Sequence, residues 1–178
     1  MKLEGGKVKK LIAYFSRADQ NYFNGELKNI EVGNTEVAAK YIQAYTGADV
    51  FKIEPLKPYS KEYNECIAQA KDDLQRKARP ELKQYLPDLS EYDEIYLGYP
   101  NYWGTMPMCV FTFLEHYDLK GKKIYPFCTH EGSGLARSEN DIKRCCDAKV
   151  MPGLAIHGSD VKQSQEKIQD WLGGKSND

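Results

Sequence analysis

Short apolar runs alternate with longer amphipathic segments along most of this chain. The short runs have the length and composition of β-strands and cover residues 8–15, 50–53, 95–99, 123–128 and 150–156. Between them, helical patterns are expected over residues 35–45, 60–77, 108–117, 135–146 and 161–172. Strand and helix therefore alternate about five times, which predicts a parallel sheet with helices on both faces.

The length of 178 residues is enough for one full core, so we expect a single domain over residues 1–178. In open α/β sheets, ligands bind beyond the carboxyl ends of the strands, where the strand order reverses. The loops after the first, third and fourth expected strands should therefore gather at one edge of the sheet. The candidate chemistry of the chain lies in these three loops.

The first of these loops leads into a helix whose start suits a phosphate group. Gly33, Asn34 and Thr35 precede the apolar helical pattern, and Ser16 ends the first strand. The N–H groups and the positive dipole end of this helix would point into the site, where Ser16 adds a hydroxyl. An ordinary N-cap made by Asn34 or Thr35 is the alternative interpretation.

The connection from Ser16 to Asn34 is far longer than the usual strand-to-helix loop of about 2–6 residues. Its Asn24-Gly25 pair is a strong signal for a two-residue type I′ turn, with NYF before it and ELKNIEV after it. We therefore predict a β-hairpin inserted at about residues 19–32, over the edge of the site. The alternative is an excursion that plays no part in the site.

The loop after the third strand, YPNYWGTMP, is strongly aromatic. Tyr102 and Trp103 are consecutive, and two consecutive residues of an extended loop cannot both point into one core. Pro100 and Pro107 stiffen the two ends of the loop, and Gly104 permits close approach of the backbone. Such a loop suits the face of a planar heteroaromatic ring, with Trp103 as the first candidate for the contact and Tyr102 as the second.

The loop after the fourth strand, THEGSG, offers backbone amides. Gly132 and Gly134 allow tight conformations in which N–H groups meet the acceptor atoms of a ligand, although a simple turn before a helix is an equal alternative. The chain lacks a complete dinucleotide fingerprint, because Arg137 stands where GSGLAR would need its last glycine. A metal or thiol site at His130 and Cys128 is not expected, since no second cluster of ligands accompanies them.

The composition of the chain argues against some classes of partner and some cellular locations. Lys and Arg number 25 against 26 Asp and Glu, and this near-neutral balance argues against a nucleic-acid binder. The apolar runs are too short for a signal or membrane segment, so we expect a cytoplasmic protein that does not enter a membrane. The five cysteines lack Cys-x-x-Cys spacing and are expected to be free thiols in a reducing compartment.

Taken together, these segments resemble the flavodoxin family, in the branch that carries YFS…GNTEVAA, YPNYWGTMP and FCTHEGSGLARS. The resemblance extends over about residues 10–172. It implies a flavodoxin-like three-layer α/β sandwich, with a five-stranded parallel sheet in the order 2-1-3-4-5 and FMN at the switch point between the first and third strands.

The loops and the resemblance together suggest a set of cofactor-binding residues, with no metal ligand and no catalytic side chain among them. They are Ser16, Arg17, Ala18, Asn34, Thr35, Pro100, Asn101, Tyr102, Trp103, Gly104, Thr129, His130, Gly132, Ser133 and Gly134. The expected hairpin splits the compact phosphate loop of the family, which leaves the roles of Arg17 and Ala18 open.

The resemblance implies an FMN-binding redox protein that transfers electrons to or from a partner protein or a small planar electron acceptor. An FMN-dependent NAD(P)H or quinone oxidoreductase of the same fold is the alternative. The near-neutral charge keeps that alternative open, because electron-carrying flavodoxins tend to be strongly acidic. A binding module without redox chemistry is a further alternative.

A receiver domain of signalling proteins is disfavoured. Such a domain needs an acidic cluster after the first strand and an Asp after the third, where this chain has Ser16-Arg17 and Tyr99-Pro100.

Overall fold

The computed structural model describes residues 8–23 and 25–175. The first half of the chain contains β1 (Lys10–Tyr14), β2 (Asp19–Phe23), β3 (Glu26–Ile30), α1 (Asn34–Thr46), β4 (Asp49–Lys52), α2 (Tyr63–Arg76) and β5 (Glu94–Pro100). The second half contains α3 (Met108–His116), β6 (Lys123–His130), α4 (Ser138–Cys145), β7 (Lys149–Val150), β8 (Leu154–His157), the 3-10 helix η1 (Gly158–Gln163) and α5 (Gln165–Lys175).

The main sheet is parallel and has the order β4-β1-β5-β6-β7, with β8 also paired to β6. Strand β1 lies inside the sheet, where Ile12 is opposite Val50 of β4 and Tyr96 of β5. Counted in the order of the five expected strands, this arrangement is 2-1-3-4-5. The predicted flavodoxin-like topology is therefore confirmed, and the strand order reverses beside β1.

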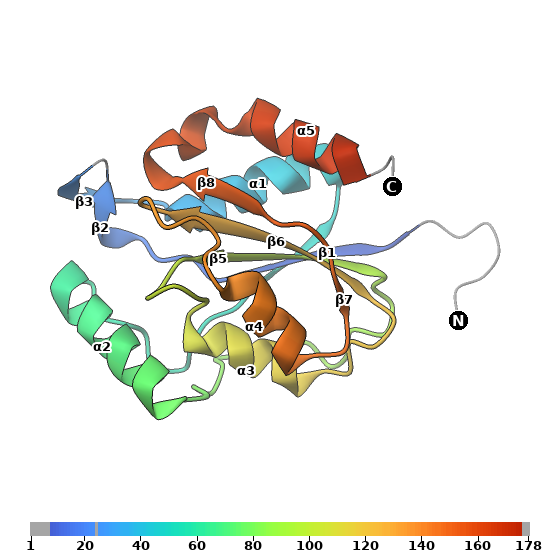
Figure 1. The fold of residues 1–178 in the computed structure, drawn as a ribbon, viewed down its shortest axis with the longest axis horizontal. Helices are drawn as coiled ribbons and strands as arrows, with labels where there is room; N and C mark the ends of the chain where they lie inside the picture. The colour runs from blue at the N-terminus through green and yellow to red at the C-terminus, as the bar shows by residue number, and fades with distance from the viewer. Residues whose placement is uncertain (1–7, 24, 176–178) are drawn as a thin grey trace.

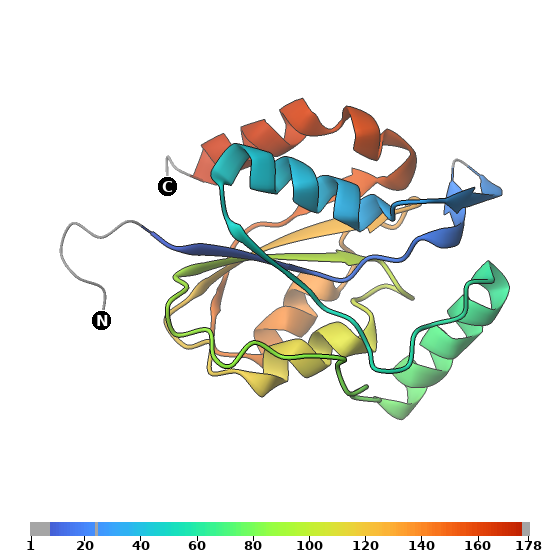
Figure 2. The same cartoon turned by 180° about the vertical axis from the view of Figure 1, so that it is seen from behind.

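Helices cover both faces of the sheet (Figures 1 and 2). Helices α1 and α5 lie on one face, and α3 and α4 lie on the other. Successive side chains of β1 point to opposite faces of the sheet and so contribute to the hydrophobic cores on both faces. Leu11 and Ala13 belong to the cluster on the α3 side, whereas Ile12 belongs to the cluster on the α1 side. Strands that are buried on both faces explain the nearly continuous apolar runs in the sequence.

Residues 150–156, expected as one strand, form two short strands with a break between them. Strand β7 pairs with β6 at Val150, and β8 resumes the pairing at Leu154. Pro152 in the break has no N–H to donate, and the N–H of Gly153 donates to Glu139 Oε2 at 2.8 Å. The ladder is therefore interrupted, and the sheet has six strands where five were predicted.

A small antiparallel sheet occupies the connection between β1 and α1. Strands β2 and β3 pair with Asp19 opposite Ile30 and Phe23 opposite Glu26, as the hairpin predicted at residues 19–32 requires. Gly25 has a φ of +85°, which suits the predicted turn, whereas Asn24 lies outside the described residues.

The helices are short, the longest being α2 with 14 residues. Within the described ranges, none combines the length and the apolar character that crossing a membrane requires. The helix expected over residues 161–172 is divided, because Ser164 donates both its N–H and its hydroxyl to the carbonyl of Val161. These bonds close the 3-10 turn η1 before α5 begins.

The five cysteines are all free thiols, as expected from the sequence. Cys109 and Cys128 are fully buried, and burial raises the pKa of both thiols. Cys145 and Cys146 are half-buried neighbours at the end of α4, and the interaction between the two thiols lowers the pKa of Cys146. Cys146 therefore forms its thiolate more readily than Cys109 or Cys128.

We expect iodoacetamide to alkylate Cys146 faster than Cys109 or Cys128 in the folded protein. The reactive form is the thiolate, so the rate at Cys146 should rise with pH and reach its plateau at a lower pH than that of an ordinary thiol. Fragment mass spectrometry of the alkylated peptides measures this rate at each pH. Cys145→Ala removes the neighbouring thiol and should move the rise to higher pH, whereas equal labelling of Cys109 would contradict the assignment.

Candidate functional site

A cavity of about 460 Å³ lies at the carboxyl edge of the sheet. Its volume falls within the range of about 300–1,000 Å³ that is usual for ligand sites. The segments that follow β1, β5 and β6 line it, together with the start of α1. The three loops expected from the sequence to carry the chemistry therefore meet in one place.

Most of the predicted cofactor contacts line this cavity. They are Ser16, Arg17, Asn34, Thr35, Pro100, Asn101, Tyr102, Trp103, Gly104, Thr129, His130 and Ser133. The remaining three, Ala18, Gly132 and Gly134, are not among its lining residues. The cavity also has a wall that was not predicted, formed by Asn21 and Tyr22 of the hairpin and by Tyr63, Cys66, Ile67 and Ala70 of α2, and Glu131 of the β6 loop lines it as well.

The end of β1 and the start of α1 touch each other across the long hairpin connection. The N–H of Glu36 donates to Ser16 Oγ at 3.0 Å, so Ser16 satisfies an amide of the first turn of α1. Gly33 packs so closely on this segment that a Cβ would overlap Ser16 Oγ and lie 2.7 Å from the carbonyl oxygen of Arg17. Because Ser16 Oγ accepts one bond, its hydroxyl proton is left to donate to a ligand.

Helix α1 begins without a side-chain cap of its own. Its N-cap is Gly33, so the alternative in which Asn34 or Thr35 caps the helix is wrong. Thr35 is buried, and its Oγ1 lies 2.8 Å from Thr129 Oγ1 at the end of β6. One of these hydroxyls donates to the other, which leaves one proton of the pair for a further acceptor. The first turn of α1 thus offers backbone and hydroxyl donors to an anion.

Arg17 and Ala18 hold the hairpin in place. The guanidinium of Arg17 donates to the carbonyl oxygens of Ser60 and Lys61, both at 2.8 Å. The side-chain amide of Asn21 donates to the carbonyls of Arg17 and Ala18 at 3.0 and 3.1 Å. The guanidinium of Arg17 is therefore hydrogen-bonded to the backbone that leads into α2.

The loop after β5 makes a tight turn at Trp103 and Gly104. Tyr102 and Thr105 exchange backbone hydrogen bonds of 2.8 and 3.3 Å, and the φ angles of +57° and +88° between them are those of a type I′ turn. A bulky residue at positive φ is strained unless its surroundings hold it. Asn101 does so, because its side chain accepts the N–H of Gly104 at 2.9 Å.

The two aromatic side chains of this turn go in different directions. Tyr102 packs edge-on against Phe15 and Tyr59, with ring centroids 5.9 Å apart in each pair. Trp103 is 45% exposed, and its indole N–H donates to the carbonyl of Ile67 in α2 at 2.9 Å. Trp103 is therefore the ring that a ligand can reach, and Tyr102 belongs largely to the core.

The loop after β6 is shaped by its glycines and by Asn101. Gly132 and Gly134 have φ angles of +140° and +63°, and the carbonyl of Gly134 accepts from the Asn101 side chain at 2.9 Å. His130 Nδ1 accepts the N–H of Gly132 at 2.9 Å, and burial together with the nearby His157 lowers the pKa of His130. The imidazole of His130 is therefore neutral at pH 7.

No group of three or more His, Cys, Asp or Glu within the described ranges is placed to hold a metal ion.

Helix α2 forms the unpredicted wall of the cavity. Tyr63, Cys66, Ile67 and Ala70 line it, and their spacing of three and four residues places them on one face of the helix. This spacing is visible in the sequence. It identifies a common face, but it does not say what that face contacts.

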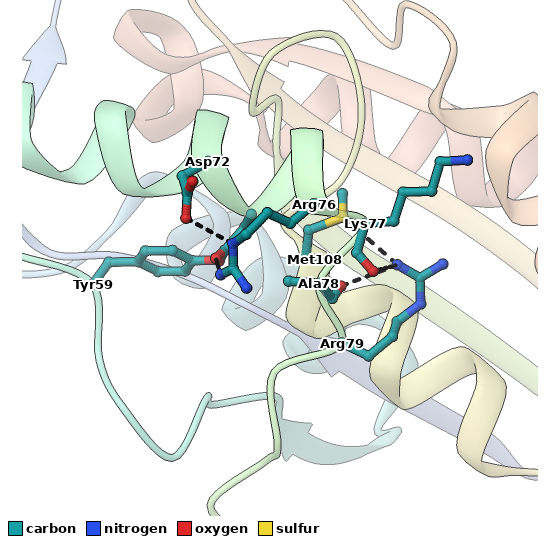
Figure 3. A network of polar contacts seen from close by, with 8 residues as sticks. Tyr59, Asp72, Arg76, Lys77, Ala78, Arg79 and Met108 are labelled. Carbon is teal, nitrogen blue, oxygen red and sulfur yellow. Dashed lines mark hydrogen bonds and ion pairs between the residues drawn. The ribbon is translucent and has the colours of Figure 1, made fainter.

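The far end of α2 is fixed to the body of the protein by polar contacts (Figure 3). The hydroxyl of Tyr59 donates to Asp73 Oδ2 at 3.0 Å. Arg79, just beyond the end of α2, approaches Met108 Sδ, at the start of α3, at 3.9 Å. These contacts hold α2 in its place as a wall.

The Flavodoxin family model matches residues 9–174 of the sequence. The chain belongs to the flavodoxin family. No curated protein matches this flavodoxin.

Solved structures with similar folds include two Bacteroides proteins that are described as flavoproteins. The protein from Bacteroides eggerthii is 28% identical, with a TM-score of 0.75 over 94% of this chain and 97% of that chain. The protein from Bacteroides uniformis is 26% identical, with a TM-score of 0.73 over 94% and 99%. A flavoprotein from Lactobacillus acidophilus, solved in complex with FMN, is 20% identical, with a TM-score of 0.63 over 88% and 98%, and shares the fold.

We expect Gly33→Ala to lower the free energy of unfolding by about 1–3 kcal/mol, because the added methyl overlaps Ser16 and the backbone must move. Urea denaturation followed by circular dichroism measures the change. Gly173→Ala is the comparison variant, since a Cβ at that position in α5 meets nothing within 4 Å and the substitution should raise stability through helix propensity. If Gly33→Ala keeps the stability of the parent, the close approach at Gly33 is not a constraint.

Proposed function

We propose that this flavodoxin binds FMN in the cavity and uses it to transfer electrons. The observation that carries the proposal is the meeting of anion-binding donors at the start of α1 with the exposed ring of Trp103, beside the point where the strand order reverses. FMN has one anionic group and one flat ring, so it needs these two features in one cavity. When bound, FMN supplies the redox chemistry, and the protein supplies orientation and electrostatics.

The donors at the start of α1 suit the phosphate of FMN. The amides of the first turn and the hydroxyl of Ser16 supply hydrogen bonds, and the helix dipole supplies partial positive charge. Thr35 and Thr129 carry one further hydroxyl proton between them. No dinucleotide fingerprint is present in the sequence, which favours FMN over FAD or NAD as the resident cofactor.

The loops after β5 and β6 suit the ring of FMN. The ammonium of Lys71 lies 5.2 Å from the ring centroid of Trp103, so a stacked flavin would use the opposite face of the indole. Thr129, His130 and Ser133 would meet the polar edge of the flavin, while Asn101 fixes both loops. The Lactobacillus acidophilus flavoprotein of the same fold binds FMN, which is consistent with this assignment.

An oxidoreductase that acts on a small planar acceptor is the second candidate. The hairpin and α2 favour it, because they close the outer side of the cavity with a wall of side chains. Such a wall would admit small molecules to the cavity and keep larger partners out. The free thiols of the chain support a reducing compartment, so we place the protein in the cytoplasm.

We expect Ser16→Ala to weaken FMN binding about ten- to a hundredfold, since a hydrogen bond to a charged group is worth about 1.5–3 kcal/mol. Riboflavin lacks the phosphate, so its affinity should change far less. Fluorescence titration of the flavin-free protein with each flavin measures both constants. Ser90→Ala is the control, because Ser90 is exposed and does not line the cavity. Equal losses for FMN and riboflavin would place the phosphate elsewhere.

We expect Trp103→Ala to weaken FMN binding about two- to tenfold, the equivalent of about 0.5–1.5 kcal/mol for an aromatic contact. Trp103→Phe should retain most of this affinity. Only two tryptophans are present in the sequence, so quenching of their fluorescence by FMN can be assigned by substituting each in turn. The quenching should disappear in Trp103→Phe and persist in Trp171→Phe, and the reverse result would move the flavin away from the β5 loop.

A further inference from the structure

The outer wall of the cavity carries aromatic rings that FMN binding, as proposed above, does not use. Tyr22 of the hairpin and Tyr63 of α2 both line the cavity, with ring centroids 5.1 Å apart at an interplanar angle of 66°. Tyr22 is 40% exposed. A large aromatic ring left this accessible on a cavity wall offers a flat ligand an apolar contact.

The backbone segments that carry these rings are bonded to each other. Gln20 of the hairpin accepts the N–H of Tyr63 through its side-chain oxygen at 2.8 Å. The backbone N–H of Gln20 donates to the carbonyl of Lys61 at 3.2 Å, and Arg17 donates to the same carbonyl at 2.8 Å. The hairpin and the start of α2 therefore form one unit, so the wall is preorganised and a ligand need not order it.

The α2 side of the wall is apolar, and Glu131 is the only Asp or Glu among the described residues that line the cavity. Ile67 and Ala70 extend the wall along the same face of α2, and Cys66 has a buried thiol. Among the described residues that line the cavity, Arg17 is the only Lys or Arg, and its guanidinium is occupied by backbone carbonyls. A dinucleotide would bring a pyrophosphate to this wall without a cation to receive it, whereas a neutral ring needs none.

We infer that Tyr22, Tyr63 and Ile67 form a second binding site in the cavity, which takes a flat, neutral aromatic electron acceptor of the quinone class. This inference rests on the proposed function, since it places the acceptor beside bound FMN. It assigns the hairpin a role in acceptor binding, and it makes a small molecule the direct redox partner.

The test uses the FMN-loaded, oxidised protein and measures binding without turnover. Equilibrium dialysis gives the affinity for menadione, and a separate fluorescence titration of the flavin-free protein gives the affinity for FMN. We expect Tyr22→Ala to weaken menadione binding about three- to tenfold and to leave FMN affinity unchanged. Tyr22→Phe should keep the parent affinity for menadione, because the ring rather than the hydroxyl makes the contact.

Tyr45→Ala is the matched control, since Tyr45 is 55% exposed on α1 and does not line the cavity. It should bind both ligands as the parent does. Unchanged menadione affinity in Tyr22→Ala would overturn the inference while the proposed function stands, as would saturable binding of NADH that Tyr22→Ala weakens. An equal loss of FMN affinity in Tyr22→Ala would assign this wall to the flavin and also overturn the inference. Failure of the parent protein to bind FMN would overturn the proposed function and this inference together.

Discussion

The site depends on one close contact, where the end of β1 meets the start of α1. The hairpin connection leaves the sheet after Ser16 and returns at Gly33, which packs directly on Ser16 and Arg17. The bond from the Glu36 amide to Ser16 Oγ closes this long loop and fixes the first turn of α1 over the sheet edge. Only a residue without a Cβ allows the approach, so Gly33 decides where the donors of α1 lie.

The rest of the cavity is tied to this contact through hydrogen bonds between neighbouring loops. Thr35 joins α1 to Thr129 at the end of β6, and Asn101 joins the β5 loop to Gly104 and Gly134. Each bond links segments that are far apart in the sequence. The geometry of the cavity is therefore a property of the assembled sheet edge, and the proposed FMN site would be largely formed before its ligand binds.

In the proposed function, the hairpin and α2 would separate this chain from an open electron carrier. The guanidinium of Arg17 donates to the carbonyls of Ser60 and Lys61, and these bonds attach the hairpin to the start of α2. The indole N–H of Trp103 donates to the carbonyl of Ile67, which attaches the β5 loop to α2. These contacts build a wall opposite the loops. If the protein transfers electrons as proposed, such a wall would limit the exchange to molecules that fit within the cavity, which is the physical reason for proposing a small acceptor.

Much of this architecture can be predicted from the sequence. Short apolar runs, as in β1, and helical spacing, as in α1, are local signals, and their alternation predicts a parallel sheet. The strand order 2-1-3-4-5 comes from the resemblance to the flavodoxin family. The three site loops follow from the rule that strand ends gather at one edge.

The remaining features depend on contacts between distant segments. The direction of Tyr102 is set by Phe15 and Tyr59, and the role of the α2 face is set by the hairpin opposite it. The break before β8 has a local cause, Pro152, but where the chain resumes pairing depends on Glu139 holding Gly153. None of these partners can be identified from spacing along the chain.

The central claim is that the cavity holds one FMN. The most direct measurement is to reconstitute the purified protein with a mixture of FMN, FAD and riboflavin, remove unbound flavin, and identify what heat releases from it. We expect FMN, in about equimolar amount with the protein. Recovery of FAD, or of no flavin at all, would contradict it.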